Sequence, residues 1–312
     1  MKPSTNDKGA ADLWPPLPFE EWRGTCATLH MWTQIVGKVR LSQAPPVNHW
    51  WQVPLYVSPR GLTTGNVPYE ARSFQIEFDF IDHRLVVLTS DGREASLALA
   101  PRTVADFYGE FMSAMRGLGL EVKIWPTPVE VADPVPFEQD TAHSSYDPVY
   151  AERFWRVLSH AERVFQKFRA GFLGKCSPVH FFWGSFDLAL TRFSGREAPP
   201  HPGAPGVADR ITREAYSHEV SSAGFWPGGD ASPEPIFYAY AYPEPEGFAD
   251  YKIRPAEGFY SPDLHEFVLR YEDVRRAADP EAALLDFLQS TYDAAADLAR
   301  WDRAALERPS QS

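Results

Sequence analysis

The sequence of 312 residues predicts an α+β fold in which helices flank antiparallel sheets. Apolar residues recur at intervals of three and four in four long segments, which is the period of one buried face of an α-helix. Between these segments, apolar and polar residues alternate in short runs that end at turn residues, as in antiparallel strands. Both halves of the chain run helix, strands and helix, which suggests two similar lobes.

The first predicted lobe covers residues 17–125. We expect the preceding leader, residues 1–16, to be disordered or loosely attached because its Gly, Ala, Pro, Ser and Asn residues show no periodicity. A helix is predicted to begin at Glu20. It must end before Pro45, because a residue that precedes proline disfavours the helical conformation.

Strands follow in the first lobe. Residues 49–57 alternate toward one side, and we expect an edge strand there because the segment contains a proline, which has no N–H to donate. Residues 73–99 predict an antiparallel meander with an Asp-Gly hairpin turn. Thr103 resembles an N-cap for the next helix, and residues 121–125 predict another short strand.

Residues 126–146 contain four prolines and no periodicity, so they predict a linker or a loop that wraps the surface. The second lobe, residues 147–302, begins with Asp147, an N-cap ahead of a helix-initiating proline. Asp279 repeats this pattern before the last helix, and we expect the tail, residues 303–312, to be frayed. Between the two helices, strands are predicted over residues 179–193, 214–221, 236–242 and 266–271.

The two lobes share a short pattern that suggests a duplication. The first helix leads into His49 within Pro-Val-Asn-His-Trp-Trp, and the second-lobe helix leads into His180 within Pro-Val-His-Phe-Phe-Trp. Coincidence explains the pattern as well, because helix-to-strand transitions often contain proline and strands often contain aromatic residues. Aligning the histidines also shifts the prolines by one residue, which reverses the face of a strand.

Composition argues against several classes of partner. The formal net charge of −12 argues against nucleic acid, because phosphate binding needs clustered Lys and Arg. No apolar run reaches the length of about 18 residues that a membrane span requires. Two cysteines allow at most one disulfide and the leader lacks an export signal, so we expect a cytoplasmic protein in a reducing compartment. The oligomeric state stays open.

Four segments carry a resemblance to a known family: residues 28–38, 46–64, 177–196 and 216–229. Over residues 18–305, the chain resembles a family of bacterial proteins of unknown function. The resemblance implies a single-family protein rather than a fusion. It implies no activity, cofactor or catalytic residue, so the chemistry has to be inferred from the residues themselves.

The segment 177–196 mixes polar and small residues with Phe, Trp and Leu, which is typical of a pocket wall. If it is one strand, His180 and Asp187 point to opposite faces, and Trp183 shares the face of Asp187. A bulge at the intervening glycine would bring the two to one face. We predict Arg192 as an anion clamp. In the alternative, His180 is a core histidine and Asp187 caps a turn.

Adjacent His218 and Glu219 point to opposite sides of a predicted strand, so they would not chelate one ion. Either of them can meet His180 from a neighbouring strand. Such a meeting would permit general acid-base chemistry, because imidazole titrates near neutral pH and a carboxylate fixes its tautomer. The Gly-Phe-Trp-Pro-Gly-Gly segment that follows predicts either a lid or an aromatic plug of the core.

The first helix places His30, Gln34 and Lys38 at successive intervals of four, which makes a polar ridge. The ridge lines a cleft between the lobes or, alternatively, is a solvated stripe. His49 lies beside two tryptophans and is, together with Arg60 in the following turn, a candidate for contact with an anion or a sugar.

Three tyrosines, Tyr238, Tyr240 and Tyr242, share one face of a predicted strand. If they are exposed, they form a platform for flat ligands or sugars, with Tyr240 at its centre. In the alternative, the rings pack in the sheet and each hydroxyl is bonded at the rim.

These residues together predict a cleft that binds, or binds and transforms, a small polar or anionic metabolite. In the catalytic version, His218 or His180 is the general base and Glu219 or Asp187 orients it. The competing hypothesis is a non-catalytic scaffold that binds ligands or proteins through exposed aromatics and Pro-rich loops. No phosphate-loop, dinucleotide or metal-spacing motif identifies a cofactor, and a metal held by sequence-distant ligands stays open.

Overall fold

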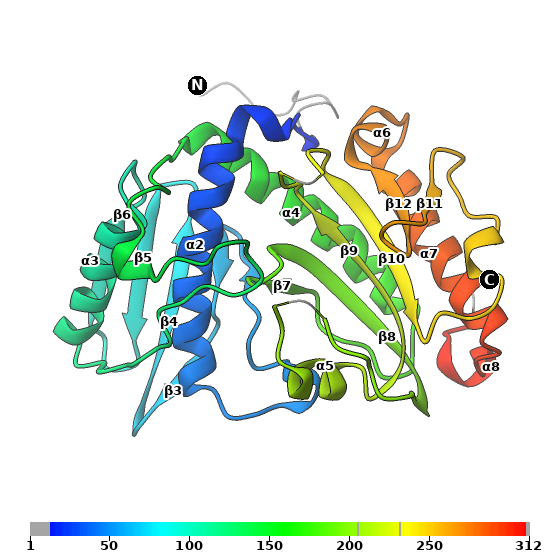
Figure 1. Cartoon of the computed structure of the whole chain (residues 1–312), viewed down its shortest axis with the longest axis horizontal. Coiled ribbons are helices and arrows are strands. Elements are labelled where there is room, and N and C mark those ends of the chain that lie inside the picture. Colours follow the sequence, from blue (N-terminus) through cyan, green and yellow to red (C-terminus); the bar gives the residue numbers. More distant parts are fainter. Residues whose placement is uncertain (1–12, 205, 231, 310–312) are drawn as a thin grey trace, which may run out of the picture.

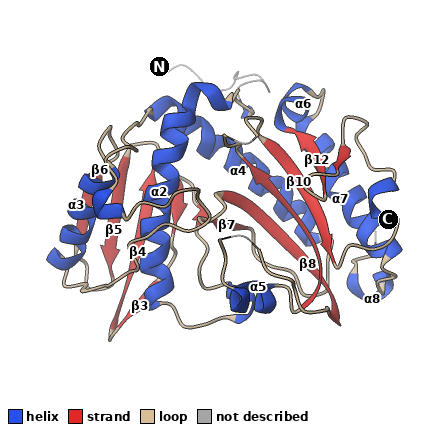
Figure 2. Cartoon of the chain, viewed as in Figure 1, coloured by secondary structure: helices blue, strands red, loops and turns tan. Residues whose placement is uncertain are grey.

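The structure is a computed structural model that describes residues 13–204, 206–230 and 232–309. Two six-stranded antiparallel sheets lie side by side, and helices pack against them (Figures 1 and 2). Seven α-helices lie in the described ranges. The predicted α+β fold with antiparallel sheets flanked by helices is therefore confirmed.

The first sheet is built by the N-terminal half, in the order β1-β2-β4-β5-β6, with β3 also paired to β4. Its strands are β1 (Tyr56–Val57), β2 (Gly61–Thr63), β3 (Val67–Tyr69), β4 (Arg72–Asp79), β5 (Arg84–Thr89) and β6 (Glu94–Ala98). Two helices belong to this half, α2 (Phe19–Gln43) and α3 (Val104–Gly117). In Figure 1, α2 crosses the front of this sheet.

The second sheet has the order β11-β12-β10-β9-β8-β7. Its strands are β7 (His180–Phe182), β8 (Asp187–Glu197), β9 (His218–Trp226), β10 (Ile236–Tyr242), β11 (Phe259–Ser261) and β12 (Glu266–Arg270). The helices of this half are α4 (Pro148–Ala170), α5 (Asp209–Ala215), α6 (Tyr271–Arg276), α7 (Pro280–Leu298) and α8 (Arg303–Leu306). Figure 1 shows α4 and α7 behind the sheet and α5 in front of it.

The two sheets meet at their edges. Leu55, next to β1, exchanges two backbone hydrogen bonds of 2.9 and 2.8 Å with Phe181 of β7. A single cluster of buried hydrophobic side chains extends from Trp14 to Trp301 and includes residues from both sheets. Packing is therefore continuous across the predicted lobe boundary.

The predicted helix caps are confirmed. Thr103 Oγ1 accepts a hydrogen bond of 3.0 Å from the N–H of Asp106. Asp147 accepts one of 2.8 Å from Val149 N–H, and Asp279 accepts one from Ala282 N–H. Each acceptor satisfies an N–H that has no partner within its own helix, which fixes where the helix begins.

The strand predicted over residues 49–57 is mostly wrong. Residues 48–50 form a 3₁₀ turn, and His49 and Trp50 have positive φ angles of 58° and 61°. Backbone bonds within this turn, such as Trp50 N–H to Val47 O, replace those of a ladder. Since His180 lies in β7, the two segments whose similarity suggested a duplication have different conformations. The strand predicted over 121–125 does not form either.

The segment predicted as one strand over 179–193 is a hairpin. Four turn residues separate β7 from β8, and Phe182 pairs with Asp187. Because His180 pairs with Ala189 in the same hairpin, His180 and Asp187 lie on one face of the sheet. The strand predicted from residue 214 begins later, at His218, because α5 extends to Ala215.

The predictions of a loose leader and a frayed tail are corrected where the structure describes them. Trp14 is only 2% exposed, and Tyr271 Oη donates to the carbonyl of Pro15. At the other end, Leu306 O accepts from Leu173 N–H at 2.7 Å, which ties α8 to the body of the protein. Residues 1–12 and 310–312 lie outside the described part.

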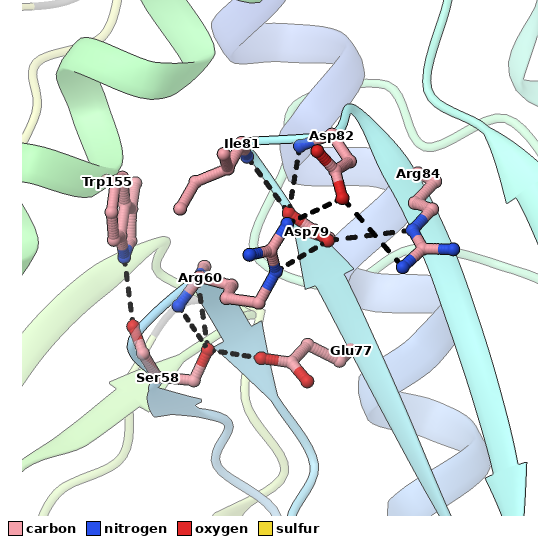
Figure 3. A network of polar contacts seen from close by, with 9 residues as sticks. Ser58, Arg60, Glu77, Asp79, Ile81, Asp82, Arg84 and Trp155 are labelled. Carbon is pink, nitrogen blue, oxygen red and sulfur yellow. Dashed lines mark hydrogen bonds and ion pairs between the residues drawn. The ribbon is translucent and has the colours of Figure 1, made fainter. Parts of the chain in front are cut away.

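A buried carboxylate connects several elements of the first half (Figure 3). Asp79, 2% exposed, accepts from Arg60 Nε at 2.8 Å and from the N–H groups of Ile81 and Asp82 at 3.0 Å. Arg84 Nε lies 3.6 Å away. Burial alone would raise the pKa of Asp79, but these donors outweigh it and hold the pKa below its usual range.

Candidate ligand-binding cavity

A cavity of about 590 Å³ lies on the face of the second sheet that points away from α4 and α7. We call it the sheet cavity. Strands β7 to β10 supply its floor, and its walls come from α2, the 3₁₀ turn at residues 48–50, α5 and the loop around Glu130. Aromatic rings supply much of its lining, among them Trp50, Trp51, Trp183, Phe193, Tyr238 and Tyr240.

Strand alternation decides which residues reach the sheet cavity. On β8, Asp187, Ala189, Thr191 and Phe193 line it. The residues between them point to the other face of the sheet, where they pack in the core. On neighbouring β9, Ser222 pairs with Thr191, and their hydroxyls are 2.9 Å apart. The floor of the cavity is thus polar at its centre and aromatic at its edges.

Asp187 is a buried carboxylate on this floor. It is 7% exposed, and it accepts hydrogen bonds from the hydroxyls of Ser185 and Tyr238. Burial raises the pKa of Asp187, although the two hydroxyl donors act in the opposite direction. A carboxylate has about four acceptor positions, so two of them stay available to a ligand.

Two further carboxyl groups lie within electrostatic reach of Asp187. The carboxyl of Glu130 packs against Gly184, where an added Cβ would lie 2.1 Å from Glu130 Oε1. Burial, together with the charge of Asp187, raises the pKa of Glu130 to about 7, even though the residue as a whole is accessible to solvent. The same two causes raise the pKa of Glu266 to about 7. Glu130 lines the sheet cavity, whereas Glu266 does not.

Lys38 reaches the sheet cavity from α2. Its side chain belongs to a residue that is 6% exposed, and its Nζ lies 5.8 Å from the centre of the Trp183 ring. Among the described residues, no hydrogen-bond acceptor or carboxylate partners the ammonium group. Burial lowers the pKa of Lys38 to about 8. Lys38 is thus a largely buried residue whose unpaired ammonium group is open to the cavity that it lines.

The tyrosine platform is partly present. Tyr238 and Tyr240 line the sheet cavity, with ring centres 6.2 Å apart and planes inclined by 15°. Tyr240 Oη is 2.7 Å from the hydroxyl of Tyr216, which also lines the cavity. Tyr242 lies outside the lining and donates to Pro199 O at 3.0 Å. Both interpretations of the platform hold in part, because the rings face the cavity and their hydroxyls are bonded.

His49 lines the sheet cavity, but its ring nitrogens are occupied. Nδ1 lies 3.0 Å from Glu214 O, to which it donates, and Lys175 Nζ donates to Nε2 at 2.6 Å. Burial, followed by the charge of Lys175, lowers the pKa of His49. The imidazole is therefore neutral and fixed in one tautomer, and it holds α5 against the 3₁₀ turn.

The structure does not bring the two candidate histidine bases together. His180 pairs with Ala189, which pairs with Gly224 of β9, whereas His218 pairs with Glu197. Gly224 and His218 are six positions apart on β9, which is about 20 Å along a strand. Burial, and then the charges of Arg40 and Arg169, lowers the pKa of His180 to about 3. Its Nε2 has no hydrogen-bond partner in the part of the chain that the structure describes.

Arg192 and Glu219 lie away from the sheet cavity. Arg192, 2% exposed, is on the core face of β8, where its guanidinium lies 3.4 Å from the centre of the Phe168 ring. Burial lowers its pKa to about 10. Glu219 forms an ion pair of 2.6 Å with Arg196. These positions do not support Arg192 as an anion clamp in this cavity or Glu219 as an orienting carboxylate.

The polar ridge of α2 is buried rather than solvated. His30 Nε2 lies 2.8 Å from Gly184 O. Gln34 donates to Val129 O and accepts from Val129 N–H, both at 2.8 Å. These contacts hold the 126–146 segment and the β7–β8 turn against α2. Trp183 lines the cavity and donates from Nε1 to Val53 O at 2.8 Å.

Several residues of the cavity were not found by sequence reasoning. Glu130 lies in the Pro-rich segment with no pattern around it, and its φ of 57° is a tertiary feature. Trp50 and Arg210 approach each other across the 3₁₀ turn and α5, with the guanidinium 5.2 Å from the ring centre. Lys38 was visible only as the end of the polar ridge, since no local signal distinguishes a buried lysine from a solvated one.

Two kinds of feature are absent from the described residues. They contain no group of three or more His, Cys, Asp or Glu side chains that could hold a metal ion. None of the helices described is both long and apolar enough to span a membrane.

Comparisons with known proteins leave the function open. A model of a family of unknown function matches residues 14–308 of the chain. No curated protein matches the sequence, and no solved structure matches the fold. The cavity has therefore to be interpreted from its own chemistry.

Proposed function

Because the chain belongs to the family of unknown function DUF5996, which assigns no activity, we propose from the sheet cavity itself that the protein binds a small, flat organic molecule with an acidic group. Cavities of this size, mostly apolar and with a few placed polar groups, are the usual form of small-molecule sites.

The observation that carries the proposal is the unpartnered ammonium group of Lys38. An unpaired charge in a largely desolvated site costs free energy, and a ligand group of opposite charge would offset that cost. A carboxylate or phosphate group in the sheet cavity would accept hydrogen bonds from Lys38 Nζ. The neighbouring ring of Trp183 would then lie beside the bound group.

The aromatic lining indicates the rest of the ligand. Trp51, Trp183 and Tyr240 contribute to different walls of the cavity. Aromatic side chains favour stacked or edge contacts with another ring, and such contacts add to the free energy gained by burial. A planar ring system fits this lining better than a flexible chain or a fully hydroxylated sugar.

The arrangement of the histidines supports binding rather than histidine catalysis. His180 and His218 lie far apart, and both ring nitrogens of His49 are occupied by protein groups. A general base must reach the proton that it abstracts.

The test compares 4-methylbenzoate with its neutral isostere 4-methylbenzamide. Quenching of tryptophan fluorescence reports binding, because several tryptophans line the cavity. We expect the benzoate to bind more tightly than the amide, and Lys38→Met to weaken benzoate binding at least tenfold. The control is Lys252→Met, which removes an exposed lysine. Equal affinity for the two probes, or a Lys38→Met protein that binds the benzoate normally, would contradict the proposal.

A further inference from the structure

We propose that the acidic floor of the sheet cavity binds a basic nitrogen, so that the ligand is an amphoteric ring compound with its acidic group at Lys38 and an ammonium group at Asp187. This inference rests on the proposed function and specifies the class of ligand. It combines two features of one cavity, the unpaired cation of α2 and the unpaired carboxyl groups next to the β7–β8 turn.

The first step is that the carboxyl groups lack a countercharge. The side chains that donate to Asp187, among the residues that the structure describes, are the neutral hydroxyls of Ser185 and Tyr238. No lysine, arginine or histidine in the described ranges forms an ion pair with Asp187, Glu130 or Glu266. By contrast, the buried carboxylate of Asp79 lies against two arginines.

The second step is that the carboxyl groups disfavour one another's ionised forms. Glu130 and Glu266 each lie close enough to Asp187 for its charge to act on them. Like charges held together in a partly desolvated site favour either protonation or the arrival of a cation. An ammonium group of a ligand near Asp187 would stabilise the ionised forms of all three carboxyl groups.

The third step is that the surroundings suit an organic cation. Tyr238 and Tyr240 present neighbouring rings beside Asp187, and aromatic faces attract ammonium groups. A bare metal ion fits less well, because the described side chains form no cluster of three ligands. The charged or titratable side chains of the protein that line the cavity are Lys38, His49, Glu130, Asp187, Arg210, Tyr216, Tyr238 and Tyr240.

The protein's own cations do not occupy the acidic floor. Within the described ranges, Lys38 has no carboxylate at ion-pair distance. His49 is bonded to backbone carbonyls and Lys175, and the exposed Arg210 lies over Trp50. The available acceptor positions of Asp187 therefore stay open to a ligand.

The experiment uses three matched sets of probes on the full chain. The first set is 4-(aminoalkyl)benzoates with one, two or three methylene groups, which allows for the unknown spacing of the two charges. The second is the corresponding 4-alkylbenzoates without the amine, and the third is (4-methylphenyl)alkylamines without the carboxylate. Affinities are measured by calorimetry at pH 7.5 with the wild-type protein and with Asp187→Asn, Glu130→Gln and Lys38→Met.

We expect at least one aminoalkylbenzoate to bind at least tenfold more tightly than its alkylbenzoate. Asp187→Asn should remove most of this ratio and leave alkylbenzoate binding within about twofold. Glu130→Gln, in an accessible loop, should reduce this ratio partially. It tests the acidic floor if the Asp187→Asn protein does not fold. Lys38→Met should weaken both benzoate sets and spare the amines.

The outcomes separate the two proposals. If alkylbenzoates bind through Lys38 and no added amine improves affinity, the inference is overturned and the proposed function stands. If no benzoate binds but the amines bind and depend on Asp187, the proposed function fails and the cation site stands alone. If neither single-charge set nor the aminoalkylbenzoates bind, both are overturned.

Discussion

Two buried aspartates, Asp79 and Asp187, show how differently one residue type is used in the two halves of the molecule. Asp79 is 2% exposed and Asp187 is 7% exposed. Asp79 accepts hydrogen bonds from backbone N–H groups and from the guanidinium of Arg60, with Arg84 close by (Figure 3). Asp187 accepts only from hydroxyls and lies in a cavity.

The pKa shifts of the two carboxyl groups have opposite directions. Charged and backbone donors hold the pKa of Asp79 below its usual range, whereas burial raises that of Asp187. A carboxylate that stabilises the fold thus has its countercharge within the protein. A buried carboxylate without a countercharge lowers the stability of the protein. Such a carboxylate is typical of a functional site.

The largest expected effect is on the Asp79 network. Asp79→Asn should lower the free energy of unfolding by about 3 kcal/mol at pH 7, because it removes the charge of a buried carboxylate that accepts from Arg60 and from two backbone N–H groups. Urea unfolding measures it. Asp82→Asn, whose side chain is 55% exposed, is the control and should cost less than about 1 kcal/mol. Since the folded pKa of Asp79 is depressed, its contribution should be lost as the pH falls below about 4.

The contrast between the two halves also shows what sequence can predict. The helices capped by Thr103, Asp147 and Asp279 were predictable, because a local side chain fixes each N-terminus. The meander over residues 73–99 was predictable from strict alternation. The 3₁₀ turn at His49 was not, because contacts with α5 distant in sequence hold it.

The candidate site was predicted only in part. Asp187, Trp183, His49 and Tyr240 do line the sheet cavity. Arg192 lies on the opposite face of β8 from Asp187, as alternation along one strand requires. The hairpin, which the sequence did not predict, instead places His180 on the face of Asp187. Which polar residues are buried without a partner depends on packing between α2, the sheet and the loop at residue 130, and no local pattern encodes that.

The next largest effect is expected at Lys38, which extends the comparison of paired and unpaired charges from the two aspartates to a cation. Lys38→Met should raise the free energy of unfolding by about 2 kcal/mol at pH 7, because it replaces an unpaired, partly desolvated ammonium group with an apolar side chain of similar length. The folded-state pKa of Lys38 is lowered to about 8, so the wild-type protein should gain stability as the pH rises from about 8 toward 10.5. Urea unfolding across this pH range should show the advantage of the variant shrinking.

A smaller effect of opposite sign to that of Asp79 is expected at Asp187. Asp187→Asn should raise the free energy of unfolding by about 1 kcal/mol at pH 8, since it removes a buried charge but keeps the shape of the side chain. The pKa of Asp187 is raised in the folded state, so the cost of its ionised form appears as the pH rises. At pH 4 the variant and wild type should have similar stability. If Asp187→Asn lost as much stability at pH 8 as Asp79→Asn, the two carboxylates would both stabilise the fold, and the contrast between them would be wrong.

The smallest effect is expected at Glu219. Its ion pair with Arg196 lies outside the sheet cavity, and the arginine side chain is 48% exposed. Glu219→Gln should change the free energy of unfolding by at most about 0.5 kcal/mol and leave benzoate affinity unchanged. Calorimetric titration measures the benzoate affinity. A tenfold loss of affinity would indicate that Glu219 contributes to the binding site.

The most direct test of the sheet cavity is a crystal structure of the wild-type chain soaked with the tightest-binding 4-(aminoalkyl)benzoate. We expect the ring to lie between the aromatic walls, with the carboxylate about 3 Å from Lys38 Nζ and the amine about 3 Å from an oxygen of Asp187. A probe bound with its charges reversed, or bound elsewhere while the cavity stays empty, would contradict this prediction.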